Sequence, residues 1–272
     1  MTHPALAPGR AAVVTGAASG IGLAACRRFA AMGMKVCMAD VAPLEAARDM
    51  VAAASDGGAS DVIARHTNVS DPVDVRALRD AACDAFGEIG VLMNNAVIRL
   101  DNTTWTAHES WRRTLDINFM GVVNGVQAFA ETMIRQRHPS VIVNVGSKQG
   151  NTNPPKNPAY NAAKAAVKSY TESLQHELRN SDGCRVSAHL LVPGWTTTGT
   201  RKHAPGALLP DQVVDHMLDA LDRDEFYIIC PDGEVTPEMD RKRILWAAGD
   251  IVENRPPLSR WHPDFAEAFT EE

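Results

Sequence analysis

The stretch that most constrains the fold of this 272-residue chain lies near its N-terminus. Residues 11–15 (AAVVT) are a short apolar run typical of a buried strand. Residues 15–22 (TGAASGIG) are rich in glycine and predict a tight turn, after which an apolar pattern of helical period runs to residue 32. A strand, a glycine turn and a helix in this order aim backbone N–H groups and a helix N-terminus at one point, which suits a pyrophosphate.

The chain repeats this alternation of strand and helix to about residue 230. Further strands are expected at residues 35–39, 61–69, 91–96, 141–146, 186–192 and 226–230. Helices are expected at residues 43–54, from 72 onward, at 106–137 and at 158–182, and Thr106 with Glu109 matches a capping box. This order predicts an α/β fold with a doubly wound parallel seven-stranded sheet, whose ligands lie at the carboxyl ends of the strands.

No internal repeat or linker marks a second core, so residues 1–230 are expected to form one dinucleotide-binding and catalytic domain. In the remaining segment, 231–272, a helix is expected from Thr236-Pro237 to about residue 251, and Pro256-Pro257 then breaks it. Two tryptophans in this segment favour packing, since burying each is worth a few kcal/mol. We expect the segment to pack across the site or on a neighbouring subunit, and the alternative is that it only covers the sheet edge.

Composition narrows the class of partner. A net charge of −6 without a basic cluster argues against nucleic acid, and no apolar run approaches the length of a membrane span. Five cysteines, none in a C-x-x-C pair, favour a reducing, cytoplasmic setting. The nine histidines show no metal-ligand spacing, so no metal site is expected. The expected partner is a small molecule.

Asp40 closes the second expected strand, about twenty positions beyond the glycine turn. A carboxylate there is placed to accept a hydrogen bond from a ribose 2′-hydroxyl, and it would repel a 2′-phosphate by roughly several kcal/mol. Positions 18, 19, 41 and 42 hold no basic residue to offset that repulsion. This pattern predicts NAD rather than NADP as the cofactor.

Tyr160 and Lys164 are four positions apart in an expected helix, so they share one face of it. A tyrosine that acts as acid or base near neutrality needs its pKa lowered by roughly three units, and a lysine charge about 4 Å away supplies energy of that order. Alone, such a pair is more often an ordinary exposed helix pair.

Motifs elsewhere in the chain indicate that Tyr160 and Lys164 are not an ordinary exposed pair. The chain resembles the short-chain dehydrogenase/reductase family, of the classical NAD-binding type, over roughly residues 10–230. The matching motifs, in order, are residues 15–22, Asp40, Asn94-Asn95-Ala96, Asn118, Ser147, Tyr160 with Lys164, and Pro193-Gly194. The interval from Ser147 to Tyr160 is also usual there. The resemblance implies a Rossmann fold and an NAD-dependent oxidoreductase that interconverts a secondary alcohol and a ketone.

The resemblance also implies roles for single residues. Tyr160 would be the general acid/base, Ser147 would hydrogen-bond the substrate oxygen, and Lys164 would hold the nicotinamide ribose and lower the tyrosine pKa. Asn118 would kink its helix and anchor a water in the proton relay. The expected cofactor contacts are Gly16, Ser19, Gly20, Ile21, Gly22, Asp40, Asn68, Val69, Asn95, Tyr160, Lys164, Pro193, Gly194, Thr196 and Thr198.

Simpler roles remain for three of these residues: Ser147 as a cap at a strand end, Asn118 as an ordinary polar helix residue, and Asp40 as the cap of the next helix. Two positions depart from the family. Val97 stands where glycine is usual and is strained unless its φ is negative. Asn68 stands where aspartate is more common, but its amide keeps an acceptor for adenine.

Loops after the strands, at residues 97–102, 148–156 and 195–209, are expected to choose the substrate. Arg99 and Arg201 are placed to meet an anion, although loop arginines are more often solvated. Glycines and prolines at 195–210 predict a loop rather than paired helices, which favours a small or medium alcohol over a sterol-sized one.

The resemblance further implies a homodimer or homotetramer formed through helices 106–137 and 158–182. Two other functional classes remain: an NAD-binding sensor without turnover, and an interaction subunit that docks through its C-terminal segment. The presence of Ser147, Tyr160, Lys164 and Asn118 together argues for the enzyme, because a sensor does not need all four.

Overall fold

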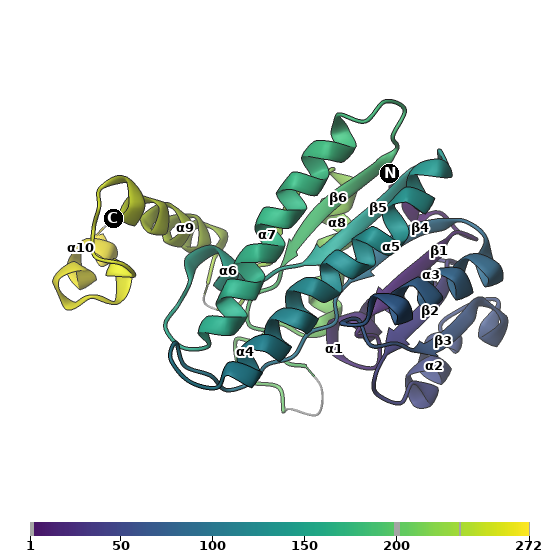
Figure 1. The fold of residues 1–272 in the computed structure, drawn as a ribbon, viewed down its shortest axis with the longest axis horizontal. Helices are drawn as coiled ribbons and strands as arrows, with labels where there is room; N and C mark the ends of the chain where they lie inside the picture. The colour runs from purple at the N-terminus through teal and green to yellow at the C-terminus, as the bar shows by residue number, and fades with distance from the viewer. Residues whose placement is uncertain (1–2, 199–201, 234, 272) are drawn as a thin grey trace.

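The computed structural model describes residues 3–198, 202–233 and 235–271. Its centre is a sheet of seven strands in the order β3-β2-β1-β4-β5-β6-β7, with every neighbouring pair parallel (Figure 1). The chain order reverses between β1 and β4, and ligands of such sheets bind beside that point. The strands are β1 (Ala11–Thr15), β2 (Lys35–Asp40), β3 (Val62–His66), β4 (Ile89–Asn94), β5 (Ser140–Val145), β6 (Val186–Val192) and β7 (Tyr227–Ile229).

Helices cover both faces of the sheet, which confirms the doubly wound α/β fold. The apolar cluster on one face includes residues of α1 (Gly20–Ala31), α2 (Glu45–Ala52) and α8 (Pro210–Asp222). The cluster on the other face includes residues of α3 (Pro72–Phe86), α5 (Gly121–Arg135) and α7 (Pro158–Arg179). Because both faces are covered, the strands are apolar along nearly their whole length.

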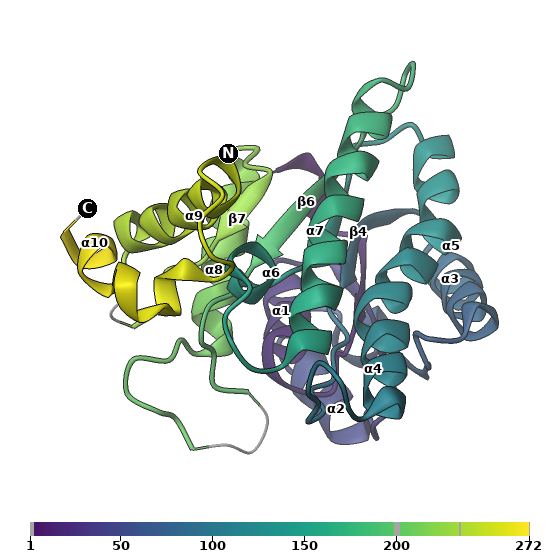
Figure 2. The same ribbon diagram turned by 60° about the vertical axis from the view of Figure 1, so that its left-hand side comes forward.

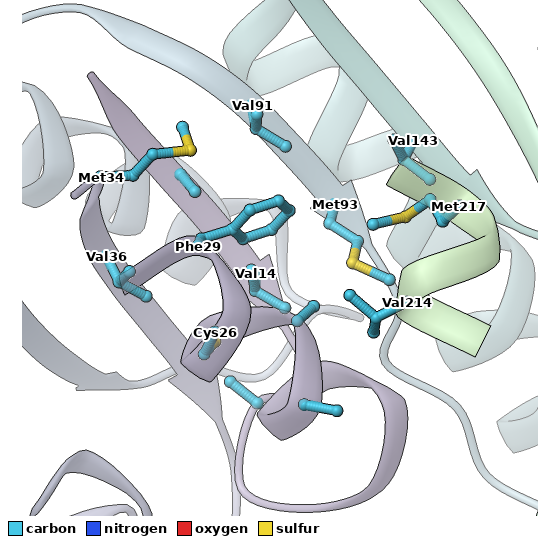
Figure 3. Close-up of a cluster of buried hydrophobic side chains, with 14 of the residues drawn as sticks. Val14, Cys26, Phe29, Met34, Val36, Val91, Met93, Val143, Val214 and Met217 are labelled. Carbon is cyan, nitrogen blue, oxygen red and sulfur yellow. The ribbon is translucent and has the colours of Figure 1, made fainter. Parts of the chain in front are cut away.

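The first of these clusters fixes the helix that follows the glycine turn. Phe29 of α1 is fully buried in this cluster near Val14 and Met93, and Met217 of α8 belongs to the same cluster (Figure 3). A fully buried phenylalanine contributes roughly 3 kcal/mol. The last turn of α1 is thereby held against the sheet.

The region between β4 and β5 differs from expectation. The single helix predicted for 106–137 is divided into α4 (His108–Leu115), a π-helical turn η3 (Asp116–Met120) and α5. The predicted capping box is wrong: the N-cap is Ala107, in a left-handed conformation with φ of 60°, and the Thr106 hydroxyl pairs with that of Thr103 at 2.5 Å. The extra residue per turn in a π-helix changes the direction in which the following side chains point.

Three α-helices were not predicted, and one of them is the C-terminal helix α10 (Ala266–Glu271). The other two are α6 (Lys148–Thr152), which interrupts the loop expected at 148–156, and α8. The loop expected before α8 is confirmed for its described residues, 195–198 and 202–209, which contain no helix or regular strand. The short 3-10 helices are η1 (Pro4–Leu6), η2 (Gly58–Asp61), η4 (Ser259–Trp261) and η5 (Pro263–Phe265).

The C-terminal segment projects from one end of the sheet (Figures 1 and 2). Its long helix α9 (Pro237–Val252) follows the N-cap Thr236, as predicted. A short helix, α10 (Ala266–Glu271), lies at the end of the segment. Trp246 is buried here and donates its indole N–H to the Ser259 hydroxyl at 2.8 Å, with the Arg255 guanidinium 4.2 Å from its ring centroid. Within the described ranges, no helix has both the length and the apolarity needed to cross a membrane.

Candidate active site

A cavity of about 700 Å³ lies at the carboxyl ends of the strands, beside the reversal between β1 and β4. We call it the site cavity. Of the residues expected to act, Gly22 and Asn118 do not line it. Those that do are Gly16, Ser19, Gly20, Ile21, Asp40, Asn68, Val69, Asn95, Ser147, Tyr160, Lys164, Pro193, Gly194, Thr196 and Thr198.

The glycine turn has no room for side chains. A Cβ on Gly16, whose φ is 67°, would lie 2.8 Å from the Cα of Ala96, and a Cβ on Gly22 would lie 2.2 Å from the Gly16 carbonyl oxygen. The Asn95 amide supports the turn from below, donating to the carbonyls of Thr15 at 2.9 Å and Gly16 at 3.1 Å. This close cradle before the N-terminus of α1 fits a dinucleotide pyrophosphate.

Asp40 lies at the end of β2 and lines the same cavity. One carboxylate oxygen accepts from the N–H of Ala18 at 2.9 Å and the other from that of Ala42 at 3.0 Å. It does not cap α2, whose N-cap is Leu44. The two hydrogen bonds hold the carboxylate next to the turn, where an adenosine ribose would lie if the turn held its pyrophosphate.

The two departures from the family are accommodated. Val97 is not among the described non-glycine residues with positive φ, so its backbone is not strained. The Asn68 side-chain oxygen accepts from the N–H and the hydroxyl of Ser70, at 3.1 and 2.8 Å. Asn68 thereby shapes the loop after β3, and Val69 beside it is buried.

Ser147, Tyr160 and Lys164 meet at the other end of the cavity. Tyr160 lies in the first turn of α7 and is 7% exposed, and Lys164 is one turn further with its Nζ 5.8 Å from the tyrosine ring centroid. Lys164 donates to the carbonyl of Val145 at 2.6 Å, at the end of β5. Ser147 follows β5 and accepts from the N–H of Gln149 at 3.2 Å, so it also caps α6.

This arrangement lowers the pKa of Tyr160. Burial alone would raise it, but the charges of Lys164 and Arg99, with hydrogen bonds from Ser147 and Arg99, outweigh that effect. Burial in turn lowers the pKa of Lys164, the Tyr160 phenolate opposes this, and Arg99 adds to the lowering. The site therefore favours the phenolate at a lower pH than water does.

Asn118 acts on the loop after β4. It lies in the π-helical turn, is fully buried, and bonds both polar groups of Ile98: its oxygen accepts from the N–H at 2.8 Å and its amide donates to the carbonyl at 2.9 Å. The side chain of Asn118 therefore holds the loop after β4 in place. Its contribution to a water relay stays a prediction.

Arg99 contacts the Tyr160 ring, and the sequence did not reveal this contact. Its guanidinium carbon lies 4.2 Å from the centroid of the Tyr160 ring, and the residue lines the site cavity. The sequence singled out Arg99 and Arg201 equally as loop arginines, and nothing local distinguished them. Arg201 lies outside the described residues.

A buried ion cluster stands next to Ser147. The Lys148 ammonium lies 2.6 Å from the carboxylate of Asp240, in α9, and 3.2 Å from that of Asp232, after β7. Asp232 also accepts from the N–H of Trp195, and a Cβ on Gly194 would collide with it. The cluster ties the C-terminal segment to the loop after β6, and the sequence pattern did not anticipate it.

Comparison with known proteins agrees with this geometry. A short chain dehydrogenase profile matches residues 10–207. The chain belongs to the short-chain dehydrogenase/reductase family. It is 34% identical over 263 residues to a 1-deoxy-11-beta-hydroxypentalenate dehydrogenase of Streptomyces exfoliatus, covering 93% of this chain and 94% of the relative. It is 39% identical over 199 residues to a cis-4-hydroxycyclohexanecarboxylate dehydrogenase of Sinomonas cyclohexanicum, covering 70% and 74%.

Solved members of the family agree as well. A short chain dehydrogenase/reductase from Burkholderia phymatum, solved in complex with NAD, superposes with a TM-score of 0.83 at 32% identity, over 94% of this chain and 98% of that one. This short-chain dehydrogenase/reductase is therefore an oxidoreductase whose relatives act on CH–OH groups. Another solved structure, of a metagenomic short-chain oxidoreductase, is a complex with NADP, so family membership alone leaves the dinucleotide open.

Proposed function

We propose that this protein is an NAD-dependent dehydrogenase that interconverts a secondary alcohol and a ketone, with Tyr160 moving the proton. The observation that carries the proposal is a buried tyrosine with a lowered pKa, between Ser147 and Lys164, in the cavity that also contains the glycine cradle. A surface pair would be solvated and would not share a cavity with a dinucleotide cradle.

The cofactor fits the residues present. The turn at 16–22 and the N-terminus of α1 would hold the pyrophosphate, and Asp40 would accept from the ribose 2′-hydroxyl. Lys164 would bind the second ribose, and the Pro193–Thr198 loop would hold the carboxamide. When bound, the nicotinamide supplies the hydride acceptor for oxidation and the hydride donor for reduction. The carboxylate of Asp40 favours NAD over NADP for the electrostatic reason given above.

The residues then divide the work at the substrate. The Ser147 hydroxyl donates to the substrate oxygen and stabilises the negative charge that develops on it. The Tyr160 phenolate accepts the alcohol proton as the carbinol hydrogen leaves as hydride, and in the reverse direction the phenol returns that proton to the carbonyl. Lys164 stays protonated and stabilises the phenolate. We also expect a homodimer or homotetramer in a cytoplasmic setting.

The direct test is Tyr160→Phe, assayed by NADH absorbance on a panel of secondary alcohols. Loss of the phenolic group should reduce turnover by roughly 10²- to 10⁴-fold while NAD binding persists. Tyr170→Phe is a matched control on the same helix, since Tyr170 packs edge-on against Phe119 away from the cavity. Turnover by Tyr160→Phe at the wild-type rate would refute the assignment, and NAD binding without turnover of any alcohol would favour a sensor.

A further inference from the structure

The loop that carries Arg99 is anchored on both sides of that residue. Before it, Ile98 is bonded through both its N–H and its carbonyl to the buried Asn118. After it, the Asn102 amide donates to the Leu100 carbonyl at 2.7 Å and its oxygen accepts from the N–H of Ala159 at 3.1 Å. Ala159 directly precedes the catalytic tyrosine in α7. The anchors therefore hold the position of Arg99 relative to the tyrosine ring.

Among the described cations near the reacting centre, Arg99 is the one that neither pairs with a carboxylate nor donates to a backbone carbonyl. Lys148 is paired with Asp232 and Asp240, and Lys164 is buried and donates to the Val145 carbonyl. In the part of the chain that the structure describes, no carboxylate forms an ion pair with Arg99. A cation that is placed in a cavity without a counter-charge recruits an anion from outside.

Arg99 hydrogen-bonds Tyr160 with part of its guanidinium, and its remaining N–H donors are available to a ligand. The guanidinium lies over the tyrosine ring with 4.2 Å between its carbon and the ring centroid. Such a cation–π contact engages the face of the group, whereas its N–H donors radiate in its plane. A planar set of donors matches the two oxygens of a carboxylate.

We propose that Arg99 binds the carboxylate of the substrate, and that the substrate is a hydroxy acid, or the corresponding oxo acid, with its carboxylate within a few bonds of the reacting carbon. The carboxylate must lie close to the reacting carbon because Arg99, which would bind it, contacts Tyr160, the proposed general base. This inference rests on the proposed dehydrogenase function and names its substrate class. Arg99 is exposed, so water weakens but does not cancel the pairing.

The test compares matched pairs of substrates: 3-hydroxybutyrate with its methyl ester, and cis-4-hydroxycyclohexanecarboxylate with its methyl ester, each with NAD. The wild-type protein should prefer one acid over its ester by roughly 10- to 100-fold in kcat/KM, as expected for a charge-assisted hydrogen bond. Arg99→Met should bring that ratio close to one, chiefly by raising KM for the acid. Arg99→Lys, which keeps the charge without the planar fork, should give an intermediate ratio.

Arg48→Met is the matched control, because Arg48 is exposed on α2 and does not line the cavity; it should keep the wild-type ratio. Equal use of acid and ester by the wild-type protein would overturn the proposal. So would an Arg99→Met variant in which both substrates fall by the same factor, since Arg99 would then act only on the tyrosine. If neither variant folds by circular dichroism, wild-type acid-to-ester preference alone decides.

Failure of the dehydrogenase function has a different signature. In that case no acid or ester reduces NAD, whereas failure of the carboxylate site leaves turnover of neutral alcohols. Calorimetric binding of acetoacetate and its methyl ester to the protein with NADH requires no turnover. Preference for the acid there, lost in Arg99→Met, supports the carboxylate site, and equal binding refutes it.

Discussion

Two cations flank Tyr160, and their effect on its ionisation sets the pH dependence of the proposed reaction. Burial would raise the tyrosine pKa, but Lys164 and Arg99 bring it below its ordinary value of about 10. Oxidation needs the phenolate as base. Alcohol oxidation should therefore rise with pH through the lowered pKa and level off above it, whereas ketone reduction, which needs the phenol, should fall over the same interval.

Removing Lys164 should move that profile. Lys164→Met removes one of the two cations, so the pKa of Tyr160 rises and the increase in oxidation shifts to higher pH, with a loss of roughly 100-fold at neutral pH. The measurement is kcat for alcohol oxidation at saturating NAD from pH 6 to pH 10. Lys168→Met, one turn further and paired with Glu172 at 2.8 Å, is the control. A profile unchanged by Lys164→Met would mean that the lysine does not tune the tyrosine.

Asp40 carries the proposed choice of dinucleotide. In Asp40→Ala the 2′-phosphate of NADP no longer faces a carboxylate, so the preference for NAD should fall by roughly 10-fold or more in kcat/KM. Asp49→Ala, an exposed position on α2, controls for loss of a surface charge. If the preference does not change, Asp40 serves only to hold the N–H groups of Ala18 and Ala42.

Among elements, the cluster of Lys148, Asp232 and Asp240 joins α6, the loop after β7 and α9. The pKa of Asp240 is raised, first by burial and further by Asp232, while Lys148 opposes the shift. When the pKa of an aspartate is higher in the folded than in the unfolded protein, the free energy of unfolding falls as the pH rises from the unfolded-state pKa to the folded-state pKa. The ionised form above that interval depends on Lys148.

Lys148→Met should lower the free energy of unfolding by about 3 kcal/mol at neutral pH, because it leaves two buried carboxylates without a counter-charge. The loss should shrink at lower pH, where Asp240 becomes protonated. Urea unfolding of Lys148→Met, Asp240→Asn and the double variant forms a mutant cycle, in which we expect a coupling of about 1–3 kcal/mol. Additive losses would show that the pair is not coupled in solution.

For the whole molecule, the position of the C-terminal segment matters most. Asp240 ties its start to Lys148, whereas Ile251 and Val252 near the end of α9 are each 84% exposed. Apolar side chains so exposed suit a contact with another subunit. Residues 231–272 were expected to act either on the site or on a neighbouring subunit. Asp240 serves the first possibility, and Ile251 with Val252 serves the second.

Deleting residues 236–272 should raise KM or reduce the native mass, measured by steady-state kinetics and by light scattering after gel filtration. Point variants separate the two routes. Ile251→Asp should reduce the mass if the segment contacts a neighbouring subunit, while Asp240→Asn should change KM if it supports the site. Unchanged kinetics and mass in the deletion variant would leave the segment as a cover for the sheet edge.

Much of the fold was accessible from local pattern. Strand Ala11–Thr15 and the glycine turn were predicted at their observed positions. The turn is visible in the sequence because close backbone contacts leave no room for a side chain at Gly16 and Gly22. The helix 106–137 was predicted unbroken, because its apolar period continues through the π-helical turn. Helix α8 was missed although Pro210 stands at its start. The capping box failed because Ala107 takes a left-handed conformation that brings Thr106 against Thr103.

The sequence alone sufficed for the glycine turn, the doubly wound parallel sheet and the helical pair of Tyr160 and Lys164, since each depends on neighbours within a turn or on the alternation of strands and helices. Only the tertiary structure decided that Arg99 lies over Tyr160 and that Lys148 meets Asp232 and Asp240. These contacts join loops far apart in the chain. Their geometry depends on how the helices pack on a common sheet. The energy of that packing is distributed over many residues, so no single sequence motif determines it.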